Sequence, residues 1–233
     1  MKVQKSVYTY IMIMNKDFVL NLIFKRLQHF FPLFFFSLMV YFFVKFVQTG
    51  EILYFVKFAL TPYLLPLVIQ RIVIGIYPIK EGGAYIGLEE HTFSPWLFSL
   101  RVQQIYLVFP QLERLLFYLP GMYSVWLRAW GSKIGKSVFW TPGTVINDRS
   151  LMDIGDFVIF GHNTYMSSHF LRVKNGRFFV YAKKIKIGSY TFIGAFTKMG
   201  PGTNIPQGSQ IQAMSLFSVN RSTPNDVMPE AKI

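Results

Sequence analysis

After Gly131 the sequence repeats with a period of six residues. From residue 187 onward a large apolar side chain occupies every sixth position, and a Thr or Ser follows each of the first five by four places. The apolar positions are Ile187, Ile193, Met199, Ile205, Ile211 and Phe217. A short fixed period is typical of solenoids, in which stacked repeats together bury a core that no single repeat buries alone. The period therefore predicts a mainly β fold, a parallel β-helix in which three hexads form one triangular coil.

The same pattern extends backwards through the preceding residues. It is carried by the pairs Ile154-Gly155, Phe160-Gly161, Met166-Ser167, Ile134-Gly135, Trp140-Thr141 and Ile146-Asn147. A slip of two residues at Met152-Asp153 separates the two sets of three. We therefore predict a β-helix domain at residues 132–222. Its four coils are expected at residues 134–151, 154–171, 187–204 and 205–222.

Residues 172–186 interrupt the period, and we expect an excursion loop there. The loop is strongly basic, and its cations are Arg172, Lys174, Arg177, Lys183, Lys184 and Lys186. A run of charge is usually a solvated surface. The alternative is that the loop meets an anionic ligand beside one edge of the β-helix, and the sequence leaves both readings open.

The hydrophobic excess of the chain lies almost wholly before residue 130. Over the whole chain, 52% of the residues are hydrophobic, and 25 residues are Phe. This hydrophobic share exceeds the usual apolar share of about 45–50%. Residues 30–44 carry no charge, and residues 52–69 are interrupted only by Lys57. Each segment is near the roughly 20 residues that span a bilayer. We therefore predict an α-helical, membrane-associating hairpin in residues 1–81, either spanning or dipping; the alternative is a buried helical pair in a soluble protein.

Two features refine the expected hairpin. Pro62 and Pro66 should kink or break its second helix, because proline removes a helical hydrogen bond. Cations lie on both sides of the hairpin, at Lys2, Lys5, Lys16, Lys25, Arg26, Arg71 and Lys80. Because positive charge marks cytoplasmic segments, we expect a cytoplasmic-membrane protein whose C-terminal domain faces the cytoplasm. Lys45 and Lys57, close to the turn, weigh against that orientation.

Residues 82–131 have the pattern of amphipathic helices. Ser94-Pro95 is typical of a helix start and Gly131 of a helix end. The aromatic residues Trp96, Tyr106, Phe117, Tyr118, Trp126 and Trp130 alternate with Arg101, Arg114 and Arg128. These helices either lie in a lipid headgroup layer or pack on the β-helix. The tail at residues 223–233 is expected to be poorly ordered.

Charge and composition limit the possible functions. A net charge of +13 suits nucleic acid, an anionic lipid surface or a phosphorylated ligand, and the aromatic half favours lipid, so we expect no nucleic-acid partner. The absence of Cys excludes disulfides, thiolate metal sites and Cys nucleophiles. The chain also lacks a Gly-rich phosphate loop followed by Lys and Ser or Thr, which argues against phosphoryl transfer.

Residues 134–222 resemble the hexapeptide-repeat acyltransferases. The resemblance is carried by the hexads and by the blocks IGDFVIFGHNTYMSSHF and IGSYTFIGAFTKMGPG. It implies a left-handed parallel β-helix, a homotrimer, and transfer of an acyl group, most simply acetyl, from acyl-CoA to a hydroxyl. An acyl carrier protein is the alternative donor. The membrane-associating half favours a saccharide or lipid-linked acceptor, and membrane lipid as a partner.

The resemblance also implies a His general base in a site between neighbouring subunits. His162 and His169 are the two candidates in the repeat. We favour His169, because it lies immediately before the excursion, where a cleft gives the base access to the acceptor proton. If the slip is absorbed at a corner, residues 147–149 stack under residues 167–169, with Gly202 above His169.

This stacking places three charged residues near the base. Asp148, or Asp153 across a corner, would orient the ring as in a catalytic triad. Arg149 would help to keep His169 neutral, because a nearby like charge disfavours protonation.

Substrate contacts are expected on small and polar residues. For the donor we expect Gly194 and Ala195 along the pantetheine arm, Lys198 or Lys184 on a nucleotide phosphate, and Gly202 beside the base. For the acceptor we expect Asn147, Asn163 and Ser168. No metal is expected, since a zinc hydratase of this fold needs three His around one ion. A non-catalytic trimeric scaffold at the membrane is the remaining alternative.

Overall fold

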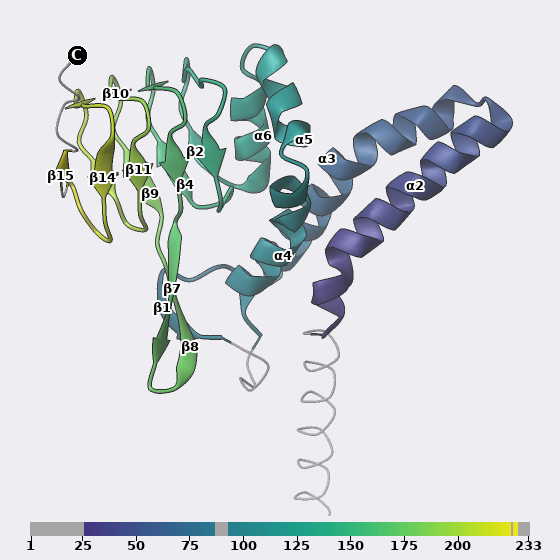
Figure 1. Cartoon of the computed structure of the whole chain (residues 1–233), viewed down its shortest axis with the longest axis horizontal. Helices are drawn as coiled ribbons and strands as arrows, with labels where there is room; N and C mark the ends of the chain where they lie inside the picture. The colour runs from purple at the N-terminus through teal and green to yellow at the C-terminus, as the bar shows by residue number, and fades with distance from the viewer. Residues whose placement is uncertain (1–25, 87–92, 225, 228–233) are drawn as a thin grey trace, which may run out of the picture.

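The computed structural model describes residues 26–86, 93–224 and 226–227. Figure 1 shows three parts in sequence: a long helical hairpin, a block of shorter helices, and a β-helix that ends at the C-terminus. The helical block lies between the hairpin and the first coil of the β-helix. It is therefore in contact with both.

The β-helix consists of stacked coils of short strands. Its strands are β2 (Lys133–Ile134), β3 (Val145–Ile146), β4 (Met152–Ile154), β5 (Ile159–Phe160), β6 (Tyr165–Met166), β9 (Ile185–Ile187), β10 (Phe192–Ile193), β11 (Lys198–Met199), β12 (Asn204–Ile205), β13 (Gln210–Ile211) and β14 (Ser215–Phe217). They form three parallel sheets, in the orders β2-β4-β9-β12, β5-β10-β13 and β3-β6-β11-β14. The apolar residue of each predicted hexad is buried. The parallel coils predicted from the hexads are thus present, while the left-handed sense remains an expectation of the resemblance.

The small residues of the hexads allow the coils to approach closely. A Cβ atom at Gly161 would lie 2.4 Å from the amide nitrogen of Ala195, and one at Gly194 would lie 2.3 Å from that of Ala213. The Thr hydroxyl of the hexad donates a hydrogen bond to a backbone carbonyl at the corner. The Thr197 hydroxyl, for example, donates to the Gly194 carbonyl at 2.7 Å. Glycine and threonine therefore repeat because each corner needs space and a hydrogen-bond donor.

The excursion is a β-hairpin and not the loop that we expected at residues 172–186. Strands β7 (His169–Lys174) and β8 (Arg177–Ala182) pair antiparallel, and β1 (Gly82–Tyr85) adds to β8. The expectation that residues from Gly82 onward form helices is therefore wrong at β1. Asn175 and Gly176 turn the hairpin with φ of 51° and 70°. Asn-Gly is the preferred pair for such a two-residue turn.

The helical block consists of α4 (Pro95–Val108), α5 (Gln111–Arg114), η2 (Leu115–Tyr118) and α6 (Met122–Trp130). The predicted ends are confirmed, since the Ser94 hydroxyl caps α4 and Gly131 ends α6 in the left-handed conformation. Trp126 and Trp130 are buried, in one core cluster with the first hexad residues. Of the two readings, packing on the β-helix therefore holds for these aromatics, whereas Tyr118 is 83% exposed.

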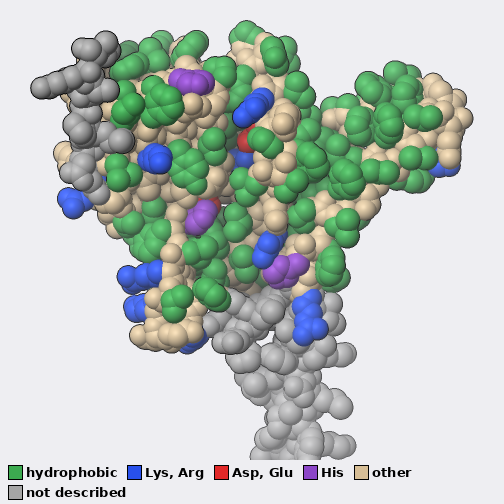
Figure 2. All heavy atoms as spheres, viewed as in Figure 1, with side chains coloured by type: hydrophobic (Ala, Val, Ile, Leu, Met, Phe, Trp, Pro, Cys, Tyr) green, Lys and Arg blue, Asp and Glu red, His purple; other side chains and the backbone are tan. Residues whose placement is uncertain are grey.

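The hairpin consists of η1 (Gln28–Phe30), α2 (Phe31–Thr49) and α3 (Ile52–Ile76), with a left-handed Gly50 at the turn. Pro62 and Pro66 lie inside α3, which continues through both, so the expected break is absent. Both helices are long and apolar enough to cross a membrane, and only 6% and 17% of their most apolar windows are buried. Figure 2 shows apolar side chains over most of the visible hairpin surface.

The structure describes only part of the two chain ends. The cations Lys2, Lys5, Lys16 and Lys25 lie outside the described residues. In the tail, β15 (Asp226–Val227) pairs antiparallel with β14. Residues 225 and 228–233 lie outside the described part.

Candidate active site

His169 forms a hydrogen-bonded pair with Asp148 where the third side of one coil ends. The predicted stacking of the Ile146, Met166 and Met199 hexads is confirmed, because Ile146 pairs with Met166 and Met166 with Met199. Asp148 then follows β3 directly below the start of β7. Its Oδ2 lies 2.7 Å from Nδ1 of His169. Of the two carboxylates considered for orienting the ring, Asp148 is the one in contact.

Two further donors fix the Asp148 carboxylate. Trp96 Nε1 donates to Oδ1 at 3.1 Å, and the Ser168 amide donates to Oδ2 at 2.9 Å. The indole of Trp96 also packs beside the imidazole, with ring centroids 4.7 Å apart. Asp148 is 3% exposed. A buried carboxylate with three donors is held in one orientation, and it orients the imidazole in turn.

This arrangement suits His169 to proton transfer. With Nδ1 bound to the carboxylate, the tautomer that leaves Nε2 free to accept a proton is favoured. Nε2 makes no hydrogen bond to any residue in the described part of the chain, and the His169 side chain is 14% exposed. A ring held at Nδ1 and accessible at Nε2 has the geometry of a general base.

Arg149 does not have the role that we expected. Its guanidinium points into the helical block, where it forms a two-bond ion pair with Glu113 and lies over the Tyr106 ring. The side-chain Oε1 of Gln103 accepts hydrogen bonds from the Arg149 backbone amide and from Nη1 of its guanidinium. Burial lowers the pKa of Arg149, but the charge and hydrogen bonds of Glu113, together with the hydroxyls of Tyr123 and Tyr106, outweigh burial and raise the pKa above its ordinary value. Its charge is therefore neutralised by Glu113, and it is not an electrostatic partner of His169.

Two other expected contacts are also different. Ser168 is fully buried and its hydroxyl donates to the Leu151 carbonyl, so it cannot meet an acceptor substrate. Gly202 does not lie above His169, because the hairpin intervenes. The Gly202 amide donates to the Lys183 carbonyl instead, and a Cβ there would lie 2.9 Å from the Lys183 side chain.

Asn147 remains beside the His169 corner. It follows β3, and its Nδ2 donates to the Tyr165 hydroxyl at 2.6 Å on the outer face of the β-helix. This amide is accessible, and it is therefore the acceptor candidate that the structure leaves next to Asp148.

His162 and Asn163 lie at a different corner, between β5 and β6. They line a cavity of about 550 Å³ together with Arg114, Phe117 and Gly143. The His162 ring packs edge-on against Phe196. Neither ring nitrogen of His162 hydrogen-bonds to a carboxylate of the described residues. The two predicted His residues are thus separated by one side of the coil, and they belong to different sites.

The predicted donor contacts are spread over several surfaces. Gly194 and Ala195 share the corner of His162, one coil further on. Lys198 lies on the outer face of β11 and is exposed. Lys184 follows β8 and lines a cavity against α3. Within one chain these residues do not converge on His169.

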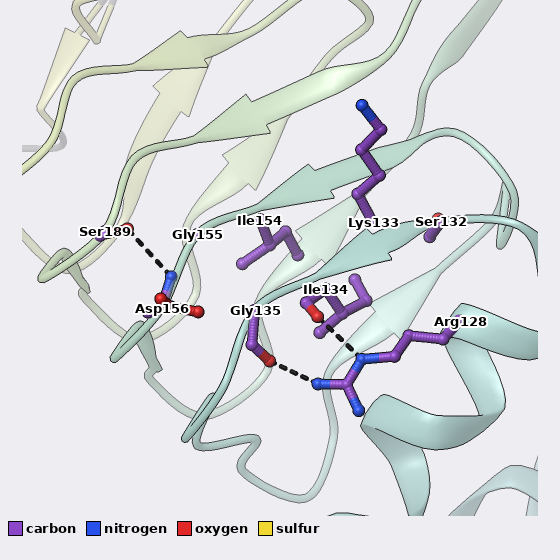
Figure 3. A pocket seen from close by; sticks show the side chains of 9 residues that line it. All are labelled: Arg128, Ser132, Lys133, Ile134, Gly135, Ile154, Gly155, Asp156 and Ser189. Atoms are coloured by element: carbon purple, nitrogen blue, oxygen red, sulfur yellow. Dashed lines mark hydrogen bonds between the residues drawn. The ribbon is translucent and has the colours of Figure 1, made fainter.

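A further cavity, of about 420 Å³, opens at the first coil and is shown in Figure 3. Arg128 donates there to the carbonyls of Ile134 and Gly135. Asp156 accepts from the Lys136 amide, while its own amide donates to Ser189. These charged groups are used to join α6 and the coils, and none of the predicted site residues lines this cavity.

Trp96 is the functional residue that the sequence reasoning did not identify. It was expected only as one aromatic of an amphipathic helix, but the start of α4 places it against both members of the pair. In the sequence, it stands immediately after Ser94-Pro95, a helix start. No local pattern connects it to Asp148, which is 52 residues away.

Among the described residues, no group of three or more His, Cys, Asp or Glu side chains is placed to hold a metal ion.

Comparison with known proteins gives structural likenesses alone. No family model and no curated protein matches the chain. Among solved structures, it is similar to a maltose O-acetyltransferase from Clostridium difficile 630, with 18% identity, 49% of this chain and 75% of that chain covered, and a TM-score of 0.38. It is also similar to a galactoside acetyltransferase in complex with coenzyme A, with 19% identity, coverage of 48% and 72%, and a TM-score of 0.33.

A third likeness is to a hexapeptide-repeat-containing acetyltransferase from Vibrio cholerae, with 14% identity, coverage of 65% and 97%, and a TM-score of 0.34.

Proposed function

We propose that the protein is a membrane-associated acyltransferase in which His169 is the general base. The observation that carries the proposal is the 2.7 Å contact of His169 Nδ1 with a carboxylate that Trp96 and the Ser168 amide hold in place. A surface histidine without a function needs no such support. Burying a carboxylate costs free energy, and here the buried carboxylate is directed at an accessible imidazole.

The reaction follows from this geometry. Nε2 of His169 takes the proton of an acceptor hydroxyl while the hydroxyl oxygen attacks the thioester carbonyl of acyl-CoA. Asp148 stabilises the imidazolium that forms. When the tetrahedral intermediate collapses, the thiolate leaves and the imidazolium returns the proton to it. An acetyl group is the simplest acyl group, and an acyl carrier protein is the alternative source of the thioester.

A homotrimer would assemble the complete site. In one chain the donor candidates Gly194 and Ala195 lie at the corner before β6 and β11, whereas His169 lies after β6. A neighbouring subunit packed on the outer face of the β-helix would bring its own corner towards His169. The donor-binding residues and the base would then come from different subunits, in the left-handed arrangement that the resemblance implies.

The acceptor is proposed to be a saccharide or lipid-linked hydroxyl at the cytoplasmic membrane. The exposed apolar hairpin supports this part, because monomeric soluble proteins rarely expose apolar patches above a few hundred Å². The catalytic β-helix would face the cytoplasm, where acyl-CoA is made. The accessible Asn147 amide lies beside Asp148 and is proposed to contact the acceptor.

The direct test is thioester consumption by the protein purified in detergent. Acetyl-CoA and longer acyl-CoAs are offered with a cellular lipid and glycan extract, and labelled product identifies the acceptor. Wild type is expected to turn over, and His169→Ala to lose at least about a hundredfold in kcat, the usual contribution of a general base. His162→Ala is the comparison variant, because His162 is the other candidate base and lies at the corner of the donor candidates Gly194 and Ala195.

The opposite pattern, loss only in His162→Ala, would move the site to the 550 Å³ cavity. If folded wild-type protein consumes no thioester from either CoA or an acyl carrier protein, the trimeric scaffold becomes the better function.

A further inference from the structure

A cavity of about 390 Å³ lies where the C-terminal part of α3 meets the β-helix. We call it the foot pocket. Its lining includes Gln70, Arg71, Gly75, Trp130, Ser150 and Lys184. Three parts of the chain thus meet here: the apolar hairpin, the end of α6, and the coil corner that carries Asp148.

The foot pocket is positively charged. Arg71 of α3 and Lys184, which follows β8, both line it, and no Asp or Glu is among its lining residues. Neither cation forms an ion pair within the described part of the chain. The Arg71 guanidinium lies against Gly131, where a Cβ atom would be 3.0 Å from it. Glycine at this position therefore leaves room for the cation. Two unneutralised cations around one cavity favour an anionic ligand.

Three lining residues also hold polar atoms without a partner. Gln70 Oε1, Trp130 Nε1 and Ser150 Oγ are buried, and they make no hydrogen bond to a described residue. Gln70 and Trp130 are each 1% exposed. Most buried polar groups in folded proteins are paired, so such a group needs an explanation. The indole N–H and the Ser150 hydroxyl are donors that a phosphate oxygen can accept from.

The apolar surface beside the pocket points to a membrane lipid as the source of that phosphate. Helix α3 contacts the helical block at Pro62 and Tyr63. It nevertheless keeps an exposed apolar row, with four-residue spacing, that runs past Arg71: Leu64, Val68, Ile72 and Ile76. Residues spaced in this way lie on one side of a helix. Lipid chains can therefore cover this side of α3 at the level of the foot pocket.

The pocket is adjacent to the catalytic pair. Ser150 follows Asp148 by two residues, so their Cα atoms are within about 8 Å of each other. Leu151, which also lines the pocket, packs in one cluster with Trp96. We infer that the foot pocket binds the phosphate of a lipid-linked acceptor, whose hydroxyl-bearing end then reaches His169. This inference rests on the proposed acyl transfer, but phosphate binding can be measured without turnover.

The binding test uses the full chain in detergent, with retained lipid measured by native mass spectrometry. The probes are didecanoyl phosphatidic acid, didecanoylglycerol without phosphate, and inorganic phosphate. Wild type should retain phosphatidic acid in preference to the other two. Arg71→Gln and Lys184→Gln should each weaken retention at least about tenfold, since each removes a charge-assisted contact. Lys136→Gln is the control, because it removes an equal charge from an exposed side chain that does not line the pocket.

A second variant fills the pocket without changing its charge. Nothing lies within 4 Å of a Cβ at Gly75, so Gly75→Leu is compatible with the α3 backbone, and it should also abolish retention. Unchanged retention in Gly75→Leu and Arg71→Gln would overturn the inference, and so would inorganic phosphate binding as tightly as phosphatidic acid.

Turnover separates this inference from the proposed function. His169→Ala should retain phosphatidic acid normally while losing acyl transfer. Arg71→Gln should raise the KM for the lipid acceptor at least about tenfold and leave the KM for acyl-CoA unchanged. Acyl transfer that is indifferent to Arg71→Gln would reject the pocket alone, whereas lipid binding without any acyl transfer would reject the enzyme proposal.

Discussion

Asp148 accepts hydrogen bonds from His169, Trp96 and the Ser168 amide. The first of these bonds fixes the tautomer of the base, and the other two fix the carboxylate. In the proposed reaction the pair would separate two tasks: His169 would exchange the proton, and Asp148 would determine which ring nitrogen does so.

Asp148→Asn tests that division. An amide at this position can donate to Nδ1 and favour the wrong tautomer, so kcat should fall by about 10³–10⁴, as in triads with the same substitution. Asp153→Asn is the control, because Asp153 was the other carboxylate considered and the structure gives it no contact with His169. Steady-state kinetics with acyl-CoA checks both variants. Equal activity of Asp148→Asn and wild type would contradict the orienting role.

We expect Trp96 to be a positioning residue, and Trp96→Phe tests this role. Phe keeps an aromatic ring near the imidazole but removes the 3.1 Å donor to Asp148 Oδ1. We expect kcat to fall about tenfold, the usual effect of losing one hydrogen bond to a charged group, with KM for acyl-CoA unchanged. A rise in KM with constant kcat would show that Trp96 contacts substrate instead.

The residue scale also shows what the sequence could reveal about the site. The proximity of His169 and Asp148 was predicted because a six-residue period assigns every residue to a position in a coil, and stacking then brings residues 20 apart together. That a His acts as the base was implied by the family resemblance. Trp96 and the Arg149–Glu113 pair could not be predicted in this way. Both contacts join the β-helix to the helical block, and no period relates the two parts.

At the scale of elements, the Arg149–Glu113 ion pair joins α5 to the first coil. The Arg149 side chain is 2% exposed and that of Glu113 14%. Removing one partner of a buried pair leaves the other charge uncompensated. The net attraction of the pair contributes little to stability, whereas removing one partner would cost several kcal/mol. The pair therefore matters mainly because neither buried charge can be lost alone.

Glu113→Gln should accordingly destabilise the protein by about 3 kcal/mol, the cost typical of breaking a buried ion pair. The double variant Glu113→Leu with Arg149→Met should recover most of that loss, because it leaves no buried charge. The free energy of unfolding, measured by denaturant titration in detergent, checks both. If the double variant is less stable than Glu113→Gln, the pair contributes through specific geometry.

The hairpin β7–β8 shows why other elements escaped prediction. The break in the hexads correctly located an excursion. Asn175-Gly176 is a strong hairpin signal within it, but the excursion was predicted as a loop from its basic residues alone. The pairing of β1 with β8 joins residues almost 100 positions apart, and a four-residue strand carries no periodicity of its own. Pro62 and Pro66 were expected to kink or break the second helix, and α3 continues through both without a break.

At the scale of the whole molecule, the helical block lies between the hairpin and the β-helix (Figure 1), and α3 contacts both α4 and α6 of this block. The exposed cations of the described chain lie mostly away from the apolar hairpin surface, for example around β7 and β8 (Figure 2). A molecule of this form suits an enzyme that is held at a membrane by one element and works beside it with another.

The position of the turn at Gly50 decides between a spanning and a dipping hairpin. Helix α2 has 19 residues and therefore rises about 28 Å, which is enough to cross the hydrocarbon core with little tilt. The chain has no Cys, so a single introduced thiol reports one position without background.

In sealed, right-side-out vesicles, Glu51→Cys should react with a membrane-impermeant maleimide, whereas Lys136→Cys on the β-helix should react only after lysis. Reaction of Glu51→Cys only after lysis would mean that the hairpin enters and leaves the bilayer from the cytoplasmic side. Reaction of Lys136→Cys in sealed vesicles would place the β-helix outside, away from the cytoplasmic supply of acyl-CoA.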